Sequence, residues 1–417
     1  MTRKKHYLPD ISSILYLARM GKHHTNVYRF TMTMNEEVDP VLLQKAVEII
    51  TPRFPVLLSG FHPNFFGDRQ IPCRSIIQVQ KDTGILVTMS KEEIEQCALR
   101  VLYRDHLLTF ECFHAQSDGY GAVAFISTLT AEYLKLRYQI EIPSGYPVLN
   151  VLDEIKEEEE CDEYLNYMAD KPSKLNKIYA YQLPKEDKNE WNIKVHQRVF
   201  SASALKKVSK EHGVSPTAFL SAVMAECIMK IQKKHKKVLK PVRVMIPVNL
   251  RGFFPSITMR NFIETIFVTM HEDDQHKSFK ELCAQFRAEM KSQLNVEHLS
   301  GMIKTHVDAQ KSVLFRMIPR GLKYTAFKIG YAFFGESNSS ITFTNLGIVN
   351  LPEVMHPYIS KMDCYLSPRS GSPYNCAMII YKDQVALNFS RYNHKSELEE
   401  LFYERLHQIM SSFELNG

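Results

Sequence analysis

The stretch Phe110-Glu-Cys-Phe-His-Ala-Gln-Ser-Asp-Gly-Tyr-Gly121 decides how this sequence is expected to fold. An apolar run typical of a β-strand delivers His114 to its C-terminal end, and residues 119–138 carry apolar side chains near helical spacing. Between them, Asp118 occupies a plausible helix N-cap, and Gly119 and Gly121 suit a tight turn. The stretch therefore predicts a strand–turn–helix unit with a histidine at the end of the strand.

Two interpretations of His114 and Asp118 follow from these residue types. Histidine is the side chain best suited to take a proton near neutral pH, and a strand end is a rigid platform for such a general base. Asp118 then braces the loop or holds a cation. In the other interpretation, His114 is an ordinary hydrogen-bonded histidine and Asp118 is a plain helix cap. The apolar strand before the motif and the amphipathic helix after it favour the first interpretation.

The rest of the first half alternates strand-like and helical segments. A helix is expected at 39–50, where Asp39 is the N-cap and Pro40 lies in the first turn. Strands are expected at 26–34, 74–79, 84–89, 98–104 and 106–113. An acidic run at 153–163 then opens a polar stretch that reaches about residue 190, and such a run is typical of a solvated linker or helix face.

The second half mixes strands and helices in a similar order. Helices are expected at 203–211, 215–234, 396–413 and, as a pair, within 278–316. Strands are expected at 194–200, 241–248, 262–270, 340–344, 375–381 and 384–390. The pattern predicts an α/β (α+β) protein with an N-terminal lobe at 1–165, a linker at 166–190 and a C-terminal lobe at 191–417.

Composition excludes several classes of protein. The 417 residues are 45% hydrophobic and 24% charged, which is too apolar for a disordered chain. The net charge of +6 is compatible with an anionic small molecule and too weak to indicate nucleic acid. Eight dispersed cysteines without metal-ligand spacing predict reduced thiols in a cytoplasm and no metal site. No run approaches 18 apolar residues, so neither an export signal nor a membrane span is expected.

Motifs of several large enzyme classes are absent from the sequence. It contains no GxxxxGK[ST] phosphate loop, no strand-bound GxGxxG, no HExxH and no GxSxG elbow. These absences disfavour kinases, nicotinamide-dependent dehydrogenases, zinc proteases and α/β-hydrolases together.

Three motifs, in order along the chain, resemble those of the chloramphenicol-acetyltransferase-like superfamily. His114-x-x-x-Asp118-Gly119 matches its HxxxDG signature, and Pro247-Val-Asn249-Leu-Arg251 matches a segment that follows a strand in the second lobe. Thr344-Asn345-Leu-Gly347 is similar to a third segment, expected to follow a strand. The superfamily includes alcohol acetyltransferases and the condensation domains of nonribosomal peptide synthetases. Bacterial alcohol-acetyltransferase-like proteins are the most similar, and the resemblance runs from residue 26 to the last helix.

The resemblance implies a fold and a mechanism. Two lobes with mixed sheets enclose a tunnel, in which His114 takes the proton from an acceptor that attacks an acyl thioester directly, without an acyl-enzyme. Asp118 has a structural role and pairs with Arg251 across the lobes, with Asn249 in the same segment. Thr344 or Asn345 donates a hydrogen bond near the oxyanion. No cofactor is implied, because acyl-CoA is a co-substrate.

Departures from the family pattern narrow the function. The doubled histidine of condensation domains is Phe113-His114 here, and the Asp-Phe-Gly-Trp-Gly segment of plant enzymes is absent, Trp191 being the single tryptophan. The expected function is transfer of an acyl group, expected to be acetyl, from acyl-CoA to a small apolar alcohol by a monomer. The alternatives are N-acyl transfer, condensation with a carrier protein, and a non-catalytic binding protein on this fold.

Two other clusters of polar residues have two interpretations each. Lysines 230, 233, 234, 236, 237 and 240 form a basic cluster around His235. They suit a solvated helix C-terminus, or else Lys233, Lys234, Lys236 and Lys237 form a patch for the phosphates of coenzyme A. The pair His23-His24 is expected at the surface or at a tunnel mouth.

Overall fold

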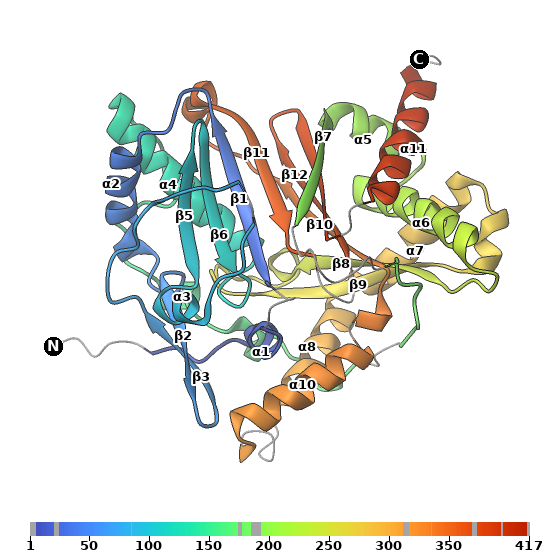
Figure 1. The fold of residues 1–417 in the computed structure, drawn as a ribbon, viewed down its shortest axis with the longest axis horizontal. Helices are drawn as coiled ribbons and strands as arrows, with labels where there is room; N and C mark the ends of the chain where they lie inside the picture. The colour runs from blue at the N-terminus through green and yellow to red at the C-terminus, as the bar shows by residue number, and fades with distance from the viewer. Residues whose placement is uncertain are drawn as a thin grey trace.

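The computed structural model describes residues 6–20, 25–84, 86–173, 177–184, 193–311, 317–334, 336–368, 373–392 and 395–414. The pair His23-His24 and Trp191 lie outside these residues. The described chain forms two lobes side by side, each with its own mixed sheet (Figure 1).

The first lobe is a five-stranded sheet in the order β11-β1-β6-β5-β4. Its strands are β1 Val27–Met34, β4 Gln80–Lys81, β5 Leu99–Arg104, β6 Leu107–Phe113 and β11 Ile359–Leu366. Helices α2 (Pro40–Ile50) and α4 (Gly119–Tyr138) pack together on one face of this sheet (Figure 1). A separate hairpin, β2 Ser59–Asn64 and β3 Gly67–Pro72, extends below it near the short helices α1 (Ile11–Ala18) and α3 (Lys91–Gln96).

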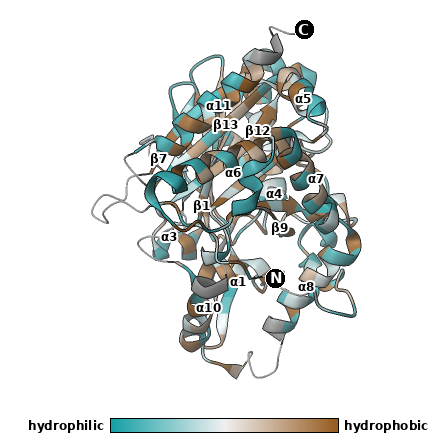
Figure 2. Cartoon of the chain, turned by 90° about the vertical axis from the view of Figure 1, so that its right-hand side faces the viewer, coloured by the Kyte–Doolittle hydropathy of each residue, from teal (hydrophilic) through white to brown (hydrophobic). Residues whose placement is uncertain are grey.

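The second lobe is a six-stranded sheet in the order β7-β13-β12-β10-β8-β9. Its strands are β7 Lys194–Ser201, β8 Val242–Asn249, β9 Ile263–Met270, β10 Ile341–Ile348, β12 Tyr374–Tyr381 and β13 Gln384–Arg391. Its helices are α5 Ala202–Glu211, α6 Pro216–His235, α7 Phe279–Gln293, α8 Val296–Lys311, α10 Arg320–Phe334 and α11 Glu397–Glu414. From the side, α5, α7 and α11 show hydrophilic residues among hydrophobic ones, as amphipathic helices do when they cover a sheet (Figure 2).

Residues on alternate faces of β12 enter two different hydrophobic cores. Cys376 and Met378 belong to the core beneath α6 and α11, whereas Ala377 and Ile379 belong to the core of the first lobe. Because successive side chains of a strand point to opposite faces, the six-stranded sheet is buried between its own helices and the first lobe. The face that looks toward the first lobe therefore lies at the boundary where a site between the lobes is expected.

Most of the expected elements are present, with shifts of a residue or two at their ends. The strands expected at 74–79 and 84–89 are wrong, because their described residues lie in no strand. The short strand β4, Gln80–Lys81, lies between the two ranges. The expected strand at 340–344 continues to Ile348 through a bulge. The α-helices and strands that the sequence analysis missed are α1, β2, β3, β4, α3, α10 and β11.

The acidic run at 153–163 is not a solvated linker throughout, which corrects the sequence interpretation. Glu159, Glu160 and Glu163 are buried. Glu159 accepts two hydrogen bonds from the guanidinium of Arg53, at 2.6 and 3.0 Å, and Glu160 accepts one from the hydroxyl of Tyr7. Glu163 accepts one from the side-chain amide of Asn166 at 2.8 Å. Burial of these carboxylates is possible because each has such a partner. The lobe boundary at 166–190 stays a prediction.

Among the described helices, none is both long and apolar enough to cross a membrane alone. Helices α5 and α6 meet such a criterion only as a pair bent by 78°.

Candidate functional site

The imidazole of His114 is held at the end of β6 between two aromatic rings. The backbone N–H of His114 donates to the carbonyl of Asn26 at 2.8 Å, which continues the pairing of β6 with β1 beyond Phe113. The ring of Tyr16, from α1, stacks on the imidazole at 4.4 Å between centroids, and the ring of Tyr28 meets it edge-on at 5.0 Å. These contacts fix the plane of the imidazole.

The electrostatic surroundings of His114 favour the neutral imidazole. Burial lowers the pKa of His114, because a charged ring loses its hydration there, although the carboxylates of Asp118 and Asp10 and the side chain of Asn261 act in the opposite direction. Nδ1 of His114 is fully buried while the residue as a whole is half-buried.

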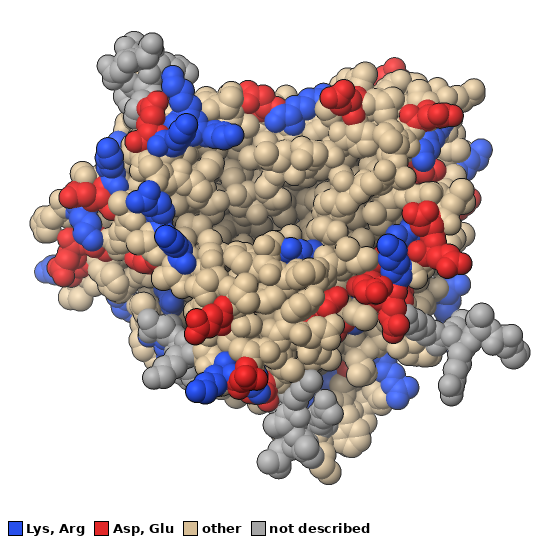
Figure 3. Space-filling view, turned by 180° about the vertical axis from the view of Figure 1, so that it is seen from behind, with Lys and Arg blue, Asp and Glu red and all other residues tan. Residues whose placement is uncertain are grey.

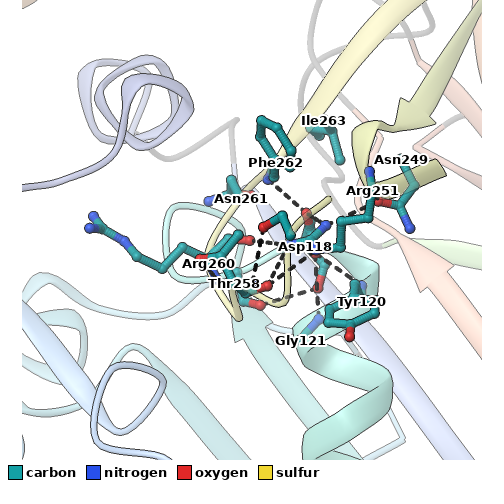
Figure 4. Close-up of polar contacts among 12 residues, drawn as sticks. Asp118, Tyr120, Gly121, Asn249, Arg251, Thr258, Arg260, Asn261, Phe262 and Ile263 are labelled. Atoms are coloured by element: carbon teal, nitrogen blue, oxygen red, sulfur yellow. Dashed lines mark hydrogen bonds and ion pairs between the residues drawn. The ribbon is translucent and has the colours of Figure 1, made fainter. Parts of the chain in front are cut away.

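Asp118 connects the two lobes through its carboxylate (Figure 4). Oδ1 caps α4 by accepting from the backbone N–H groups of Tyr120 at 3.0 Å and Gly121 at 3.5 Å. Oδ2 accepts from Nη1 of Arg251 and from the backbone N–H of Phe262, both at 2.8 Å. The ion pair expected between Asp118 and Arg251 is present, and both side chains are at least 95% buried.

Arg251 also fastens the loop between β8 and β9 that carries it (Figure 4). Its guanidinium donates to the carbonyl of Thr258 through Nε and Nη2 and to the carbonyl of Arg260 through Nη2, at 2.7–3.2 Å. Nη1 also donates to Oδ1 of Asn249, and the guanidinium lies 4.3 Å from the ring centroid of Tyr120. Asn249 thus supports the arginine, and Arg251 binds the loop to the start of α4.

The turn after His114 packs so closely against this loop that it needs a glycine. A Cβ atom on Gly121 would lie 2.3 Å from the carbonyl oxygen of Met259, and the hydroxyl of Ser117 donates to that same oxygen at 2.6 Å. A Cβ on Gly119 would meet only the end of the flexible Leu346 side chain. The sequence analysis placed Gly119 in the site, but Gly121 is the position where the structure tolerates a side chain less well.

Asn261 is a site residue that sequence reasoning missed. Its side chain interacts with the imidazole of His114 and acts to raise the pKa of that ring. Oδ1 of Asn261 and Nδ1 of His114 are both buried. Nδ2 of Asn261 donates at 3.3 Å to Oδ2 of Asp10 and to the carbonyl of Ala115. Asp10 is itself buried and caps α1 by accepting from Ser13 N–H at 2.7 Å. No motif joins residues 10, 114 and 261, so only the fold reveals this group.

The segment Thr344–Gly347 lies inside β10, not after it. Nδ2 of Asn345 donates to the hydroxyl of Thr217 near the start of α6, and Oδ1 accepts from the backbone N–H of Gly347. Gly347 has φ +73°, which favours glycine. Because Asn345 points toward α6, Thr344 points toward the first lobe, where Leu346 reaches Gly119. Of these two residues, Thr344 is therefore the one on the face of β10 that looks toward the first lobe.

The structure does not bring the lysine cluster to this site. Thr217, at the start of α6, contacts Asn345, whereas Lys233, Lys234, Lys236 and Lys237 are at the other end of this 20-residue helix, which is about 30 Å long. Lys234 also pairs with Glu397 at 2.9 Å.

A different group of cations surrounds the start of α6. A surface cavity of about 750 Å³ there is lined by Ser215 and Pro216, the residues directly before Thr217. Four basic side chains also line it: Lys206, Lys210, Arg287 and Lys291. Viewed from behind, the middle of the molecule has a hollow with almost entirely uncharged walls, in the region where the two lobes meet (Figure 3).

We expect Asp118→Ala to destabilise the protein by about 3–5 kcal/mol, because Arg251 would remain buried without its partner. Asp39→Ala is the matched control, since Asp39 caps α2 in the same way through Val41 N–H and Leu42 N–H. Loss of a cap alone costs about 1 kcal/mol. Chemical denaturation measures both. Equal losses in the two variants would show that the ion pair contributes nothing beyond the cap.

We expect Gly121→Ala to cost about 1–3 kcal/mol of unfolding free energy, because the new methyl group displaces the carbonyl of Met259. Gly252→Ala, where no described atom lies within 4 Å of the added Cβ, should change stability by less than about 0.5 kcal/mol. Thermal melting of the two variants compares them. A Gly121→Ala protein as stable as the Gly252→Ala protein would contradict the close approach.

No protein-family model matches this sequence, and no curated protein sequence matches it. Solved structures do match over nearly the whole chain. Polyketide synthase associated protein 5 from Mycobacterium tuberculosis is 15% identical, with a TM-score of 0.61 and 99% of each chain covered. Trichothecene 15-O-acetyltransferase from Fusarium sporotrichioides is 10% identical, with a TM-score of 0.60 and 98% of this chain and 95% of that chain covered.

A third similar structure is the condensation domain of the Monacolin K polyketide synthase, at 14% identity, with a TM-score of 0.57 and 99% of this chain and 98% of that chain covered. At these identities the comparisons establish the fold alone. The chain has the two-lobed fold that condensation domains share with acyltransferases.

Proposed function

We propose that this protein transfers an acyl group from a thioester donor to a hydroxyl group, with His114 as the general base. The observation that carries the proposal is the setting of His114: its imidazole is fixed between Tyr16 and Tyr28, and its Nδ1 is buried. Burial lowers the pKa of the ring, which favours the neutral form that a base needs, and we assign Nε2 to the substrate. The place of His114 beside a loop anchored by a buried ion pair supports a positioned base better than a purely structural histidine.

The chain and its two substrates supply every group that the proposed step needs. Nε2 of His114 takes the proton of the acceptor hydroxyl while the acceptor oxygen forms a bond to the thioester carbonyl carbon. The carbonyl oxygen carries the negative charge of the tetrahedral intermediate, and the hydroxyl of Thr344 donates to it. The intermediate collapses with breakage of the carbon–sulfur bond, and the imidazolium returns its proton to the departing thiolate. Asp118 takes no part in the proton transfer, because its carboxylate binds Arg251 and caps α4.

The proposed substrates follow from the chemistry of the surfaces. The uncharged hollow seen in Figure 3 suits a small apolar alcohol. Acyl-CoA is the proposed donor, and we assign its phosphates to Lys206, Lys210 and Lys291 at the cavity beside Ser215. An amine acceptor, a carrier-protein thioester and a non-catalytic binding role are the alternatives.

Replacing His114 with alanine should lower turnover by about 10²–10⁴-fold without unfolding the protein. His106→Ala is the matched control, because His106 is exposed at the opposite end of β6. Release of free thiol from acetyl-CoA, with panels of alcohols and amines, measures the reaction. A folded His114→Ala protein with normal turnover would refute the role. Transfer to amines alone, or from carrier-protein thioesters alone, would select the corresponding alternative.

The rate should also depend on pH in a direction set by burial. A lowered pKa keeps the imidazole neutral to lower pH than an ordinary histidine, which titrates near 6.5. We therefore expect kcat/KM to be constant at neutral pH and to fall on acidification with a midpoint below 6.5. A midpoint above 6.5 would mean that a charged neighbour, and not burial, dominates at His114.

Variants of the two lysine clusters should differ in their Michaelis constants for the donor. Replacing Lys206, Lys210 and Lys291 with glutamine should raise the Michaelis constant for acetyl-CoA several-fold at low salt, less so at high salt. The matched variant replaces Lys233, Lys234, Lys236 and Lys237 and should leave the constant unchanged. Steady-state kinetics at two salt concentrations compare them. A rise in the second variant only would return the donor site to the C-terminal end of α6.

A further inference from the structure

The tip of the β2–β3 hairpin and the outer face of α10 together expose an unusual number of large apolar side chains. Phe65 and Phe66, in the turn between the strands, are 67% and 55% exposed. On α10 and just before it, Met317, Leu322 and Ile329 are 71%, 66% and 56% exposed. We call these five residues the apolar tip.

Ordered contacts hold the hairpin and α10 together, so the apolar tip is one surface. The backbone N–H of Arg320 donates to the carbonyl of Phe65, and Nζ of Lys323 donates to the carbonyl of Phe66, both at 2.8 Å. Asp68 accepts from Arg320 at 3.0 Å and from the hydroxyl of Tyr324. The hairpin and α10 lie side by side at the lower end of the molecule (Figure 1).

Helix α10 carries apolar side chains on its exposed face as well as on the face that packs against the protein. Residues 322, 325, 326 and 329, which are leucine, threonine, alanine and isoleucine, are all exposed and share one side of the helix by their spacing. The inner side, with Tyr324 and Phe327, packs into the cluster that includes Leu17 of α1 and Phe61 of β2. The outer apolar stripe is thus additional to what the fold requires.

The charged side chains that are exposed on the described parts of these two segments are all positive. Residues 317–334 contain no aspartate or glutamate, and the only acidic residue in 59–72 is Asp68, which is buried against Arg320. Arg69 and Lys328 are exposed on the same two segments. Apolar anchors flanked by cations without exposed acids are the pattern that binds the headgroup region of an anionic bilayer.

We propose that the apolar tip docks the protein on an anionic membrane surface. Phe65, Phe66, Leu322 and Ile329 enter the boundary between headgroups and acyl chains, while Arg69 and Lys328 meet lipid phosphates and carboxylates. Such attachment lies on the membrane and needs no spanning helix. It does not depend on the proposed acyl transfer.

Sedimentation of the full chain with vesicles tests the proposal. The vesicles contain phosphatidylcholine alone or phosphatidylcholine with about a third phosphatidylserine. The unmodified protein should bind the anionic vesicles, bind neutral ones much less, and dissociate as salt is added. The double variant Phe65→Ser with Phe66→Ser should bind at least about tenfold more weakly, because two apolar anchors are lost. A second double variant, Leu322→Ser with Ile329→Ser, should behave likewise.

The matched control is Val41→Ser with Val238→Ser, which removes two side chains that are 63% and 81% exposed away from the tip. It should bind like the unmodified protein, and circular dichroism should show all the variants folded. Absence of binding by the unmodified protein, or equal binding by the Phe65 and Phe66 variant, would overturn the proposal. A concentration-dependent dimer that this variant loses, without vesicle binding, would assign the tip to self-association instead and also overturn it.

Discussion

Asp118 and Arg251 come from different lobes, and each is buried to a depth where a lone charge is very costly. Their pairing therefore constrains several things at once. One carboxylate oxygen starts α4, and the other holds both the arginine and the backbone at Phe262. The arginine in turn fixes the carbonyls of the β8–β9 loop. The position of His114 relative to the second lobe follows from this network, because His114 lies four residues before Asp118.

The histidine is supported from three distant parts of the chain. Tyr16 and Asp10 come from the N-terminal helix region, Tyr28 from β1 and Asn261 from the β8–β9 loop. The carboxylate of Asp10, the amide of Asn261 and the imidazole of His114 thus lie next to one another in space. Burial still dominates at the ring, because the pKa of His114 is lowered even though carboxylates lie near it.

The sequence predicted what depends on local patterns and motifs. The strand–turn–helix around His114, the caps at Asp39 and Asp118, and the approach of Arg251 to Asp118 were all expected and are present. Two kinds of feature were missed. Strand β11 contains Lys361 and Asp363, whose polarity hides its alternation, although the two pair at 3.0 Å in the fold. Asn261 has no signal of its own, because its role arises only when Asp10 and His114 lie beside it. The two extra strands were expected from short apolar runs that the tertiary structure leaves unpaired.

The position of strand β11 affects how the two lobes fold and unfold. It comes from the second half of the sequence, yet it forms the edge of the first sheet by pairing with β1 from Tyr28 to Met34. A fragment ending near the lobe boundary would leave that edge of β1 open, and open edges recruit other chains. The two lobes are thus not separable in sequence. We therefore expect the two lobes to unfold together.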